Sequence, residues 1–385
     1  MIYLDYSATT PVSLEVLDTM NKVTKEYIGN ANSINGLGIK SAALLEASIK
    51  QIADTLGINE QEITFTSSST ESNNIALIGY AMAHYKEGKH IIVSKLEHAS
   101  IYSICDYLKS IGFEISYVKN MDNGLIDFED LKSLIRKDTI LVSICAVNSE
   151  LGIRQPLKMI RQTIKKENNA TVFHSDMTQA IGKTPVNLHD VDLASISSHK
   201  IFGPKGIAML YVNSQVKINP LVYGSGKTNS LKPGTPALPL IVGFSKAIRI
   251  AMEGIEKKEK YIYLLNRRIS SKISTYPGVL INSTPYSIPH ILNVSFISVK
   301  PETFVHALDQ EEIYISTNTA CSSGDISNAV LAVYNDVQRA GHTIRISLSH
   351  VTTGEEVTKF IEKFTEIYSR LSKLTVGDNE KGNNN

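Results

Sequence analysis

The sequence is poor in cysteine and has no long apolar run. Its three cysteines, Cys105, Cys145 and Cys321, are widely spaced, which excludes a disulfide framework and a CxxC metal site, so we expect no bound metal. No apolar run reaches the roughly 18 residues of a membrane-spanning helix. The first residues, MIYLDYSATT, lack the basic and then apolar plan of a signal peptide. These absences favour a soluble, cytoplasmic protein.

An excess of charge of either sign is also missing. Lys and Arg together number 39 and Asp and Glu 38, which gives a formal net charge of +1. Nucleic acids and anionic membranes both require a clustered positive surface, so we expect neither as a direct partner. The 385 residues, 42% of them hydrophobic, are enough for two large domains.

The order of the apolar patterns predicts an α/β fold. Apolar residues recur at helical spacing over residues 16–27 and 45–56. Short β-rich runs follow at residues 63–66, 90–94, 115–118, 139–147, 171–175, 193–197 and 207–212. Most are separated by stretches long enough for a helix, and several are apolar on both faces. This alternation predicts a mainly parallel sheet covered by helices.

The second half of the chain shows a different pattern. A Gly/Pro-rich stretch at residues 223–239 predicts a long surface loop and a domain border. A long helical pattern over residues 240–273 precedes two β-rich runs, 291–296 and 343–348, and a final helix. The polar tail is expected to be disordered.

Three polar segments follow predicted strands, at the edge where parallel α/β sheets bind ligands. Ser69 and Thr70 open a helix, so their hydroxyls and N–H groups either bind a phosphate or simply cap the helix. Asp176, with Gln179, either pairs with a protonated ring nitrogen or caps a helix. Lys200, next to Ser197 and His199, is either a covalent anchor for a carbonyl cofactor or an exposed loop lysine.

Three further side chains are candidates for proton transfer, thiol reactivity and carboxylate binding. His98 follows another predicted strand and either stacks on a cofactor and moves protons or has only a structural role. Cys321 lies among small residues that predict an accessible, mobile thiol. Arg345 interrupts a predicted strand and either binds a carboxylate through two hydrogen bonds or lies on the surface. Together the six segments predict a pyridoxal-phosphate enzyme that performs sulfur chemistry on an amino acid.

The chain resembles the cysteine desulfurases of the NifS/IscS type, within the class V aminotransferase-like enzymes. The resemblance runs from residue 2 to about residue 373, through the ordered motifs YLDYSATTP, TSSSTESNN, KLEHAS, AVNSELG, HSDMTQ, SSHKIFGPKG, PGTPALP, TNTACSS and IRISLS. It implies a PLP-dependent transferase of fold type I and a homodimer. The implied domains are an arm (1–14) that joins a small domain, a large cofactor domain (15–240), an interdomain helix with a small α+β domain (241–375) and a disordered tail (376–385).

The resemblance also implies a role for each candidate residue. Lys200 binds the cofactor covalently, Asp176 pairs with its ring nitrogen, His98 stacks on the ring and Gln179 contacts the ring oxygen. The remaining residues bind the phosphate, the substrate carboxylate or the sulfur: Ser69, Thr70, Ser197 and His199 hold the phosphate, Thr235 reaches the partner's phosphate, Arg345 binds the substrate carboxylate and Cys321 carries the persulfide.

Four positions depart from the pattern of the family. They are Ser149 in place of an asparagine, Asn35 in place of a histidine, His350 in place of an arginine and Ser68 in place of a glycine. These departures put in question the reaction rate and the substrate preference that the family pattern implies. They leave the lysine, the aspartate and the cysteine in place.

The predicted function is conversion of L-cysteine to L-alanine, with the sulfur passed from Cys321 to an acceptor or scaffold protein. The acceptor stays open between iron–sulfur cluster assembly, tRNA thiolation and sulfur modification of DNA. Two alternatives remain at this point: a related lyase for selenocysteine or another β-substituted amino acid, and a catalytically weak scaffold that binds sulfur acceptors.

Overall fold

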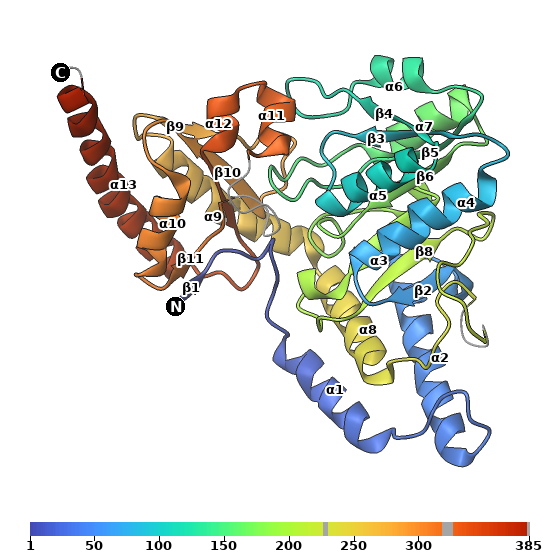
Figure 1. Ribbon diagram of the computed structural model, residues 1–385. Helices are drawn as coiled ribbons and strands as arrows, with labels where there is room; N and C mark the ends of the chain where they lie inside the picture. The colour runs from blue at the N-terminus through green and yellow to red at the C-terminus, as the bar shows by residue number, and fades with distance from the viewer. Residues whose placement is uncertain (226–229, 318–325, 383–385) are drawn as a thin grey trace.

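The central sheet has seven strands in the spatial order β2-β8-β7-β6-β5-β3-β4 (Figure 1). The structure is a computed structural model that describes residues 1–225, 230–317 and 326–382, with side chains up to residue 373. The strands are β2 (Ile63–Thr66), β3 (His90–Ser94), β4 (Glu114–Val118), β5 (Thr139–Ser143), β6 (Val172–Asp176), β7 (Leu193–Ser197) and β8 (Ala208–Val212). Only β8 runs antiparallel to its neighbours. The predicted α/β fold with a mainly parallel sheet is therefore confirmed.

Both faces of this sheet are buried because side chains alternate between them. On β3, Ile91 and Val93 pack into one core, whereas Ile92 packs into the other. The first face is covered by α3 (Ser69–Asn74), the π-helical turn Ile75–Gly79, α4 (Tyr80–His84) and α5 (Ala99–Ser110). The second core contains residues of α1 (Leu14–Glu26), α2 (Gly36–Leu56), α6 (Phe128–Leu134), α7 (Leu157–Glu167) and α8 (Leu238–Met252).

A smaller body is built from the two ends of the chain (Figure 1). Its antiparallel sheet has the order β12-β10-β9, and a parallel pair joins β1 to β11. The strands are β1 (Ile2–Tyr3), β9 (Val279–Ile281), β10 (Ile291–Phe296), β11 (Ile313–Tyr314) and β12 (Thr343–Ser347). The helices are α9 (Ile255–Ile273), α10 (Pro301–Asp309), α11 (Asn328–Tyr334), α12 (Val337–Gly341) and α13 (Gly354–Gly382).

The helical pattern at residues 240–273 forms two helices, so the prediction of one long helix is wrong. α8 ends at Met252 and α9 begins at Ile255, because Gly254 between them adopts φ 62°, which interrupts a right-handed helix. α8 packs in the core of the large sheet and α9 in the core of the small body. The chain therefore passes from the core of the large sheet to that of the small body at this break.

Two element ends also differ from the sequence prediction. β5 ends at Ser143 rather than at residue 147, and the chain turns a few residues later at Asn148, whose side-chain oxygen accepts hydrogen bonds from two following N–H groups. α13 continues to Gly382, through most of the tail that was expected to be disordered. Each residue added to an existing helix gains a backbone hydrogen bond, which favours such an extension.

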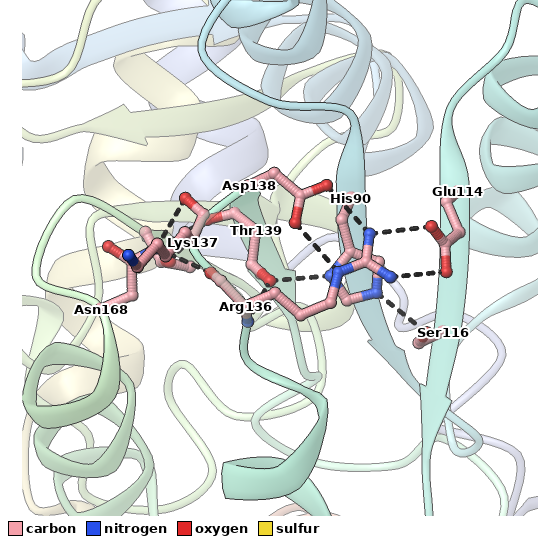
Figure 2. Close-up of polar contacts among 9 residues, drawn as sticks. His90, Glu114, Ser116, Arg136, Lys137, Asp138, Thr139 and Asn168 are labelled. Atoms are coloured by element: carbon pink, nitrogen blue, oxygen red, sulfur yellow. Dashed lines mark hydrogen bonds and ion pairs between the residues drawn. The ribbon is translucent and has the colours of Figure 1, made fainter.

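The amino edge of the large sheet is closed by an ion-pair network around Arg136 (Figure 2). The Arg136 guanidinium binds both carboxylate oxygens of Glu114, at 2.7 and 2.8 Å, and both of Asp138, at 2.9 Å each. His90, at the start of β3, contacts the Thr139 hydroxyl at 2.7 Å. The network ties the starts of three strands together at the edge opposite to the one at which ligands bind.

Among the described residues, no helix has the length and apolar character that crossing a membrane requires.

The small body depends on a cluster of aromatic rings, which gives a first prediction. Phe364 is fully buried, with ring centroids of Phe304 at 5.0 Å and Tyr368 at 5.7 Å. Phe364→Ala should lower the free energy of unfolding by about 3–5 kcal/mol, through lost burial and a residual cavity. Tyr263→Ala, at a half-exposed position on α9, is the control and should change it little. Denaturant titration measures both, and equal effects would contradict the assigned core.

Candidate active site

A cavity of about 240 Å³ lies at the carboxyl edge of the large sheet. Nine of the predicted site residues line it: Ser69, Thr70, His98, Asp176, Gln179, Ser197, His199, Lys200 and Arg345. All but Arg345, which is on β12 of the small body, lie at the carboxyl ends of β2, β3, β6 and β7 or in the segments that follow them. The cavity therefore forms where the ends of the parallel strands meet the smaller body.

One end of the cavity is lined by hydroxyls at the start of α3. The Ser69 and Thr178 hydroxyls are 2.7 Å apart, and Ser68 accepts a hydrogen bond from the first turn of the helix at 3.2 Å. The first N–H groups of a helix have no partner within it and, like hydroxyls, can bind anion oxygens. This end of the cavity can therefore hold a phosphate.

A buried carboxylate lies in the cavity wall. Asp176 is the last residue of β6, and its Oδ1 accepts a hydrogen bond from the Thr178 backbone at 2.9 Å. Its Oδ2 accepts one from Asn73 Nδ2 at 3.0 Å. Such a carboxylate can pair with a protonated ring nitrogen in the cavity.

His98 is at the same time a cavity residue and the N-cap of α5. Its Nδ1 accepts the backbone N–H of Ser100 at 3.2 Å. Burial and the nearby charge of Lys200 lower the pKa of His98, against the opposing effect of Asp176. The imidazole is therefore predominantly neutral near pH 7.

The Lys200 amine is held by the N-terminal arm. Its Nζ donates to the carbonyl oxygens of Ser7 and Ala8, at 2.6 Å each. His199 contacts the Thr9 hydroxyl at 3.0 Å, and burial and neighbouring lysines lower its pKa to about 4. The arm thus positions the one lysine of the cavity lining, next to a neutral histidine.

Gln179 connects the same arm to a buried lysine. Its Nε2 donates to the carbonyl oxygen of Ser7 at 2.9 Å, and its Oε1 accepts from Lys183. Burial, together with the charges of Lys200 and Arg345, holds the pKa of Lys183 well below its usual range. Because its oxygen is occupied, the Gln179 amide can offer the cavity a hydrogen-bond donor.

Arg345 is almost fully buried between the two bodies, with 2% of its side chain exposed. One terminal nitrogen donates to Asp5 Oδ1 at 2.9 Å and the other to the carbonyl oxygen of Ser149 at 3.1 Å. Its Nε has no partner among the described residues. Arg345 also lines the cavity, and each of its terminal nitrogens has a second hydrogen, so the guanidinium can bind a carboxylate there.

The two remaining predicted residues, Thr235 and Cys321, have different outcomes. Thr235 lies on the loop before α8 and lines a separate cavity of about 290 Å³, together with Lys232 and Phe65. Cys321 lies outside the described residues. The two described cysteines are buried, and burial raises the pKa of the Cys105 thiol to about 12 and that of Cys145 well above its usual range.

Two of the atypical positions lie at the cavity. Ser149 lines it, and its backbone carbonyl rather than its side chain contacts Arg345. Ser68 also lines it and caps α3 through its hydroxyl. Both serines thus retain a defined structural contact.

The other two atypical positions have structural partners away from the cavity. Asn35 caps α2 by accepting the Gly38 N–H at 2.9 Å. His350 packs edge-on against the ring of Phe202, with centroids 5.0 Å apart.

Several residues at the site were not singled out from the sequence. Asp5, Asn73, Ser100 and Lys183 each contact a predicted residue, through the bonds to Arg345, Asp176, His98 and Gln179. Asp5 and Asn73 stand inside the motifs YLDYSATTP and TSSSTESNN. Position within those motifs was the one available signal, because neither residue follows a predicted strand directly.

Comparison with known proteins gives consistent matches along the chain. The family described as Aminotransferase class-V matches residues 2–360. A NifS/IcsS protein homolog of Lactobacillus delbrueckii subsp. bulgaricus is 39% identical over 97% of this chain and 99% of its own length. Cysteine desulfurase IscS of Dictyoglomus turgidum is 36% identical over 97% of this chain and 96% of its own. A solved NifS-like protein matches with a TM-score of 0.91 at 36% identity, over 96% of this chain and all of its own.

The ion pair between Arg345 and Asp5 gives a second prediction. Asp5→Ala should lower the free energy of unfolding by about 3 kcal/mol, because it leaves the buried guanidinium charge without its partner. Asp18→Ala, at an exposed position on α1, is the matched control. Urea titration of both variants is the measurement. A loss no larger than that of the control would mean that Asp5 does not stabilise Arg345.

Proposed function

Because this chain belongs to the aminotransferase class-V family, and within it to the cysteine desulfurases of the NifS/IscS type, we propose that the cavity at the carboxyl edge of the sheet is its active site. The enzyme is a pyridoxal-phosphate-dependent cysteine desulfurase, which converts L-cysteine to L-alanine and passes the sulfur to an acceptor. The observation that supports this location is the gathering of a lysine amine, a hydrogen-bonded carboxylate and a row of hydroxyls around one cavity.

The chemistry of these groups fits pyridoxal phosphate. Ser69, Thr70, Ser197 and His199 would hold the phosphate, and the Asp176 carboxylate would hold the protonated ring nitrogen. Gln179 would donate to the ring oxygen, and Lys200 would anchor the cofactor covalently. When bound, the cofactor withdraws electrons from the amino acid and so weakens the bonds at its α-carbon.

The remaining groups would act on the substrate. Arg345 would bind the carboxylate of L-cysteine through the remaining hydrogens of its terminal nitrogens. Lys200 and His98 would move protons at the amine and at the imidazole. The thiolate of Cys321 would attack the substrate sulfur, so that the carbon–sulfur bond breaks and a sulfur–sulfur bond forms on Cys321. The high pKa of the thiols of Cys105 and Cys145 supports a different residue in this role.

We propose a homodimer in which Thr235 serves the site of the partner. The support is that Thr235 lines a cavity apart from the active site of its own chain. Lys232, three residues earlier, makes an ion pair with Glu71 at the start of α3, which fixes this loop beside the phosphate end of the cavity.

The sulfur acceptor is a further protein, and iron–sulfur cluster assembly is one pathway it could serve.

Alanine and sulfide assays separate this function from its alternatives. Incubation with L-cysteine and a reductant should yield both products. A selenocysteine lyase would release alanine from selenocysteine with no need for Cys321, and a weak scaffold would release neither product at a useful rate. Absence of both products from the cofactor-loaded protein would overturn the proposal.

Lys200 is predicted to anchor the cofactor. Lys200→Ala should abolish turnover and also the covalent attachment of cofactor to protein after borohydride reduction, because no amine remains at that position. Lys166→Ala, at an exposed position on α7, is the control. Mass spectrometry of the reduced proteins is the measurement, and cofactor still attached in Lys200→Ala would assign the anchor elsewhere.

Cys321 is predicted to carry the transferred sulfur. Cys321→Ser should keep the absorption spectrum of the bound cofactor and yield no persulfide, since a hydroxyl cannot accept sulfur in this way. Cys105→Ala, within α5, is the control and should retain the added sulfur. Peptide mass spectrometry after cysteine treatment locates the sulfur. Finding it on Cys145 would refute the assignment.

A further inference from the structure

The position of His98 at the start of a helix determines which of its ring nitrogens carries the hydrogen. His98 is the N-cap of α5, with extended backbone angles of φ −73° and ψ 152°. Its Nδ1 lies 3.2 Å from the backbone nitrogen of Ser100 and 2.9 Å from the Ser100 hydroxyl. A backbone N–H can only donate, so Nδ1 must be the acceptor. In the neutral ring the single hydrogen is then on Nε2.

The Ser100 hydroxyl is oriented by a second residue. Its oxygen accepts a hydrogen bond from Asn73 Nδ2 at 3.1 Å, which leaves its own hydrogen free to point at His98 Nδ1. Nδ1 therefore accepts from two donors of the same serine, one from the backbone and one from the side chain. Both contacts oppose protonation at Nδ1.

Asn73 ties this arrangement to the carboxylate in the cavity wall. It is fully buried, and its Nδ2 donates to Asp176 Oδ2 at 3.0 Å as well as to Ser100. Rotating the amide by half a turn would place its oxygen against the Asp176 carboxylate, so charge fixes the orientation. One amide group thus uses both of its hydrogens to link the carboxylate of Asp176 with the serine that holds His98.

The second ring nitrogen of His98 is left for the ligand. Nε2 has no hydrogen-bond partner among the described side chains and backbone groups, and His98 lines the cavity. Besides His98, the charged and titratable groups that line the cavity are Cys145 after β5, Asp176 from β6, His199 and Lys200 after β7, and Arg345 from β12.

We propose that Asn73 and Ser100 are positioning residues that hold His98 as the Nε2–H tautomer, so that the imidazole presents a proton donor, and not a free lone pair, to whatever occupies the cavity. The proposal rests on the cavity being the active site and adds the direction in which His98 exchanges protons. The first proton it moves leaves from Nε2, and the lone pair created there can then take a proton back. Uptake at Nδ1 would break the cap of α5.

The electrostatics of the helix end agree with this geometry. The start of α5, a helix of 12 residues, carries a partial positive charge, which disfavours a second positive charge on the capping imidazole. Burial and Lys200 act in the same direction and lower the pKa of His98, while Asp176 opposes them. The neutral tautomer is therefore the resting form at neutral pH.

The tautomer can be measured without turnover. Histidine labelled with ¹⁵N is incorporated into the cofactor-loaded protein, and the His98 signals are assigned from their absence in His98→Asn. We expect a pyridine-like shift for Nδ1 and a pyrrole-like shift for Nε2 at pH 7, without substrate. A pyrrole-like Nδ1, or two protonated nitrogens, would overturn the proposal. Because no desulfurase activity enters this readout, its failure and that of the proposed function can be told apart.

The role of Ser100 has a separate test with rescue. Ser100→Ala removes one donor to the neutral ring, so the pH at which His98 titrates should rise by about 0.5 to 1 unit. The acid limb of the profile of kcat/KM against pH should shift to higher pH in the same way. Ser100→Thr should restore both, and Ser103→Ala, exposed on the same helix, should change neither. An unchanged titration in Ser100→Ala, or no recovery in Ser100→Thr, would show that the hydroxyl has no such role.

Discussion

The N-terminal arm, residues 4–10, links the two bodies of the molecule and shapes the cavity between them. Ser347 of β12 donates its backbone N–H to Leu4 at 2.7 Å, and its hydroxyl accepts from the backbone of Ser7 at 2.9 Å. On the other side, the Thr10 backbone donates to the His199 carbonyl oxygen at 2.9 Å. Because the arm is anchored at both ends, the carbonyl oxygens of Ser7 and Ala8 are held where they accept hydrogen bonds from the Lys200 amine. The backbone of the arm thus fixes the position of the amine.

Desolvation divides the titratable groups around this cavity into charged and neutral ones. The buried charge of Arg345 is paired with Asp5. Lys183 has no carboxylate among its described contacts, and burial holds its pKa well below the usual range. Burial also lowers the pKa of His199, to about 4. Burial likewise raises the pKa of Glu97, beneath the cavity wall, to about 8. Burial without a counter-charge thus favours the neutral forms of Lys183, His199 and Glu97, whereas Arg345, which is paired with Asp5, keeps its charge.

Most of the large sheet could be predicted from the sequence, because its strands are apolar runs with a clear period. The bounds of β2, β3 and β7 agree with the runs at residues 63–66, 90–94 and 193–197. The candidate residues that follow those strands could be found for the same reason. Asn73 and Asp5 could not, since their roles depend on contacts with residues 103 and 340 positions away. The break at Gly254 was missed because apolar spacing continues across it, and only the backbone angle reveals it.

The atypical residue Ser149 illustrates how backbone contacts limit the effect of a side-chain change. What Arg345 contacts at this position is the carbonyl oxygen, which is the same for every amino acid. The turn that presents this carbonyl is set by the neighbouring Asn148, whose side chain accepts the backbone N–H groups of Glu150 and Leu151 at 3.0 and 2.7 Å. A serine in place of an asparagine at 149 therefore leaves the support of the guanidinium unchanged. Its effect is confined to what its own side chain offers the cavity, where a hydroxyl reaches less far than an amide.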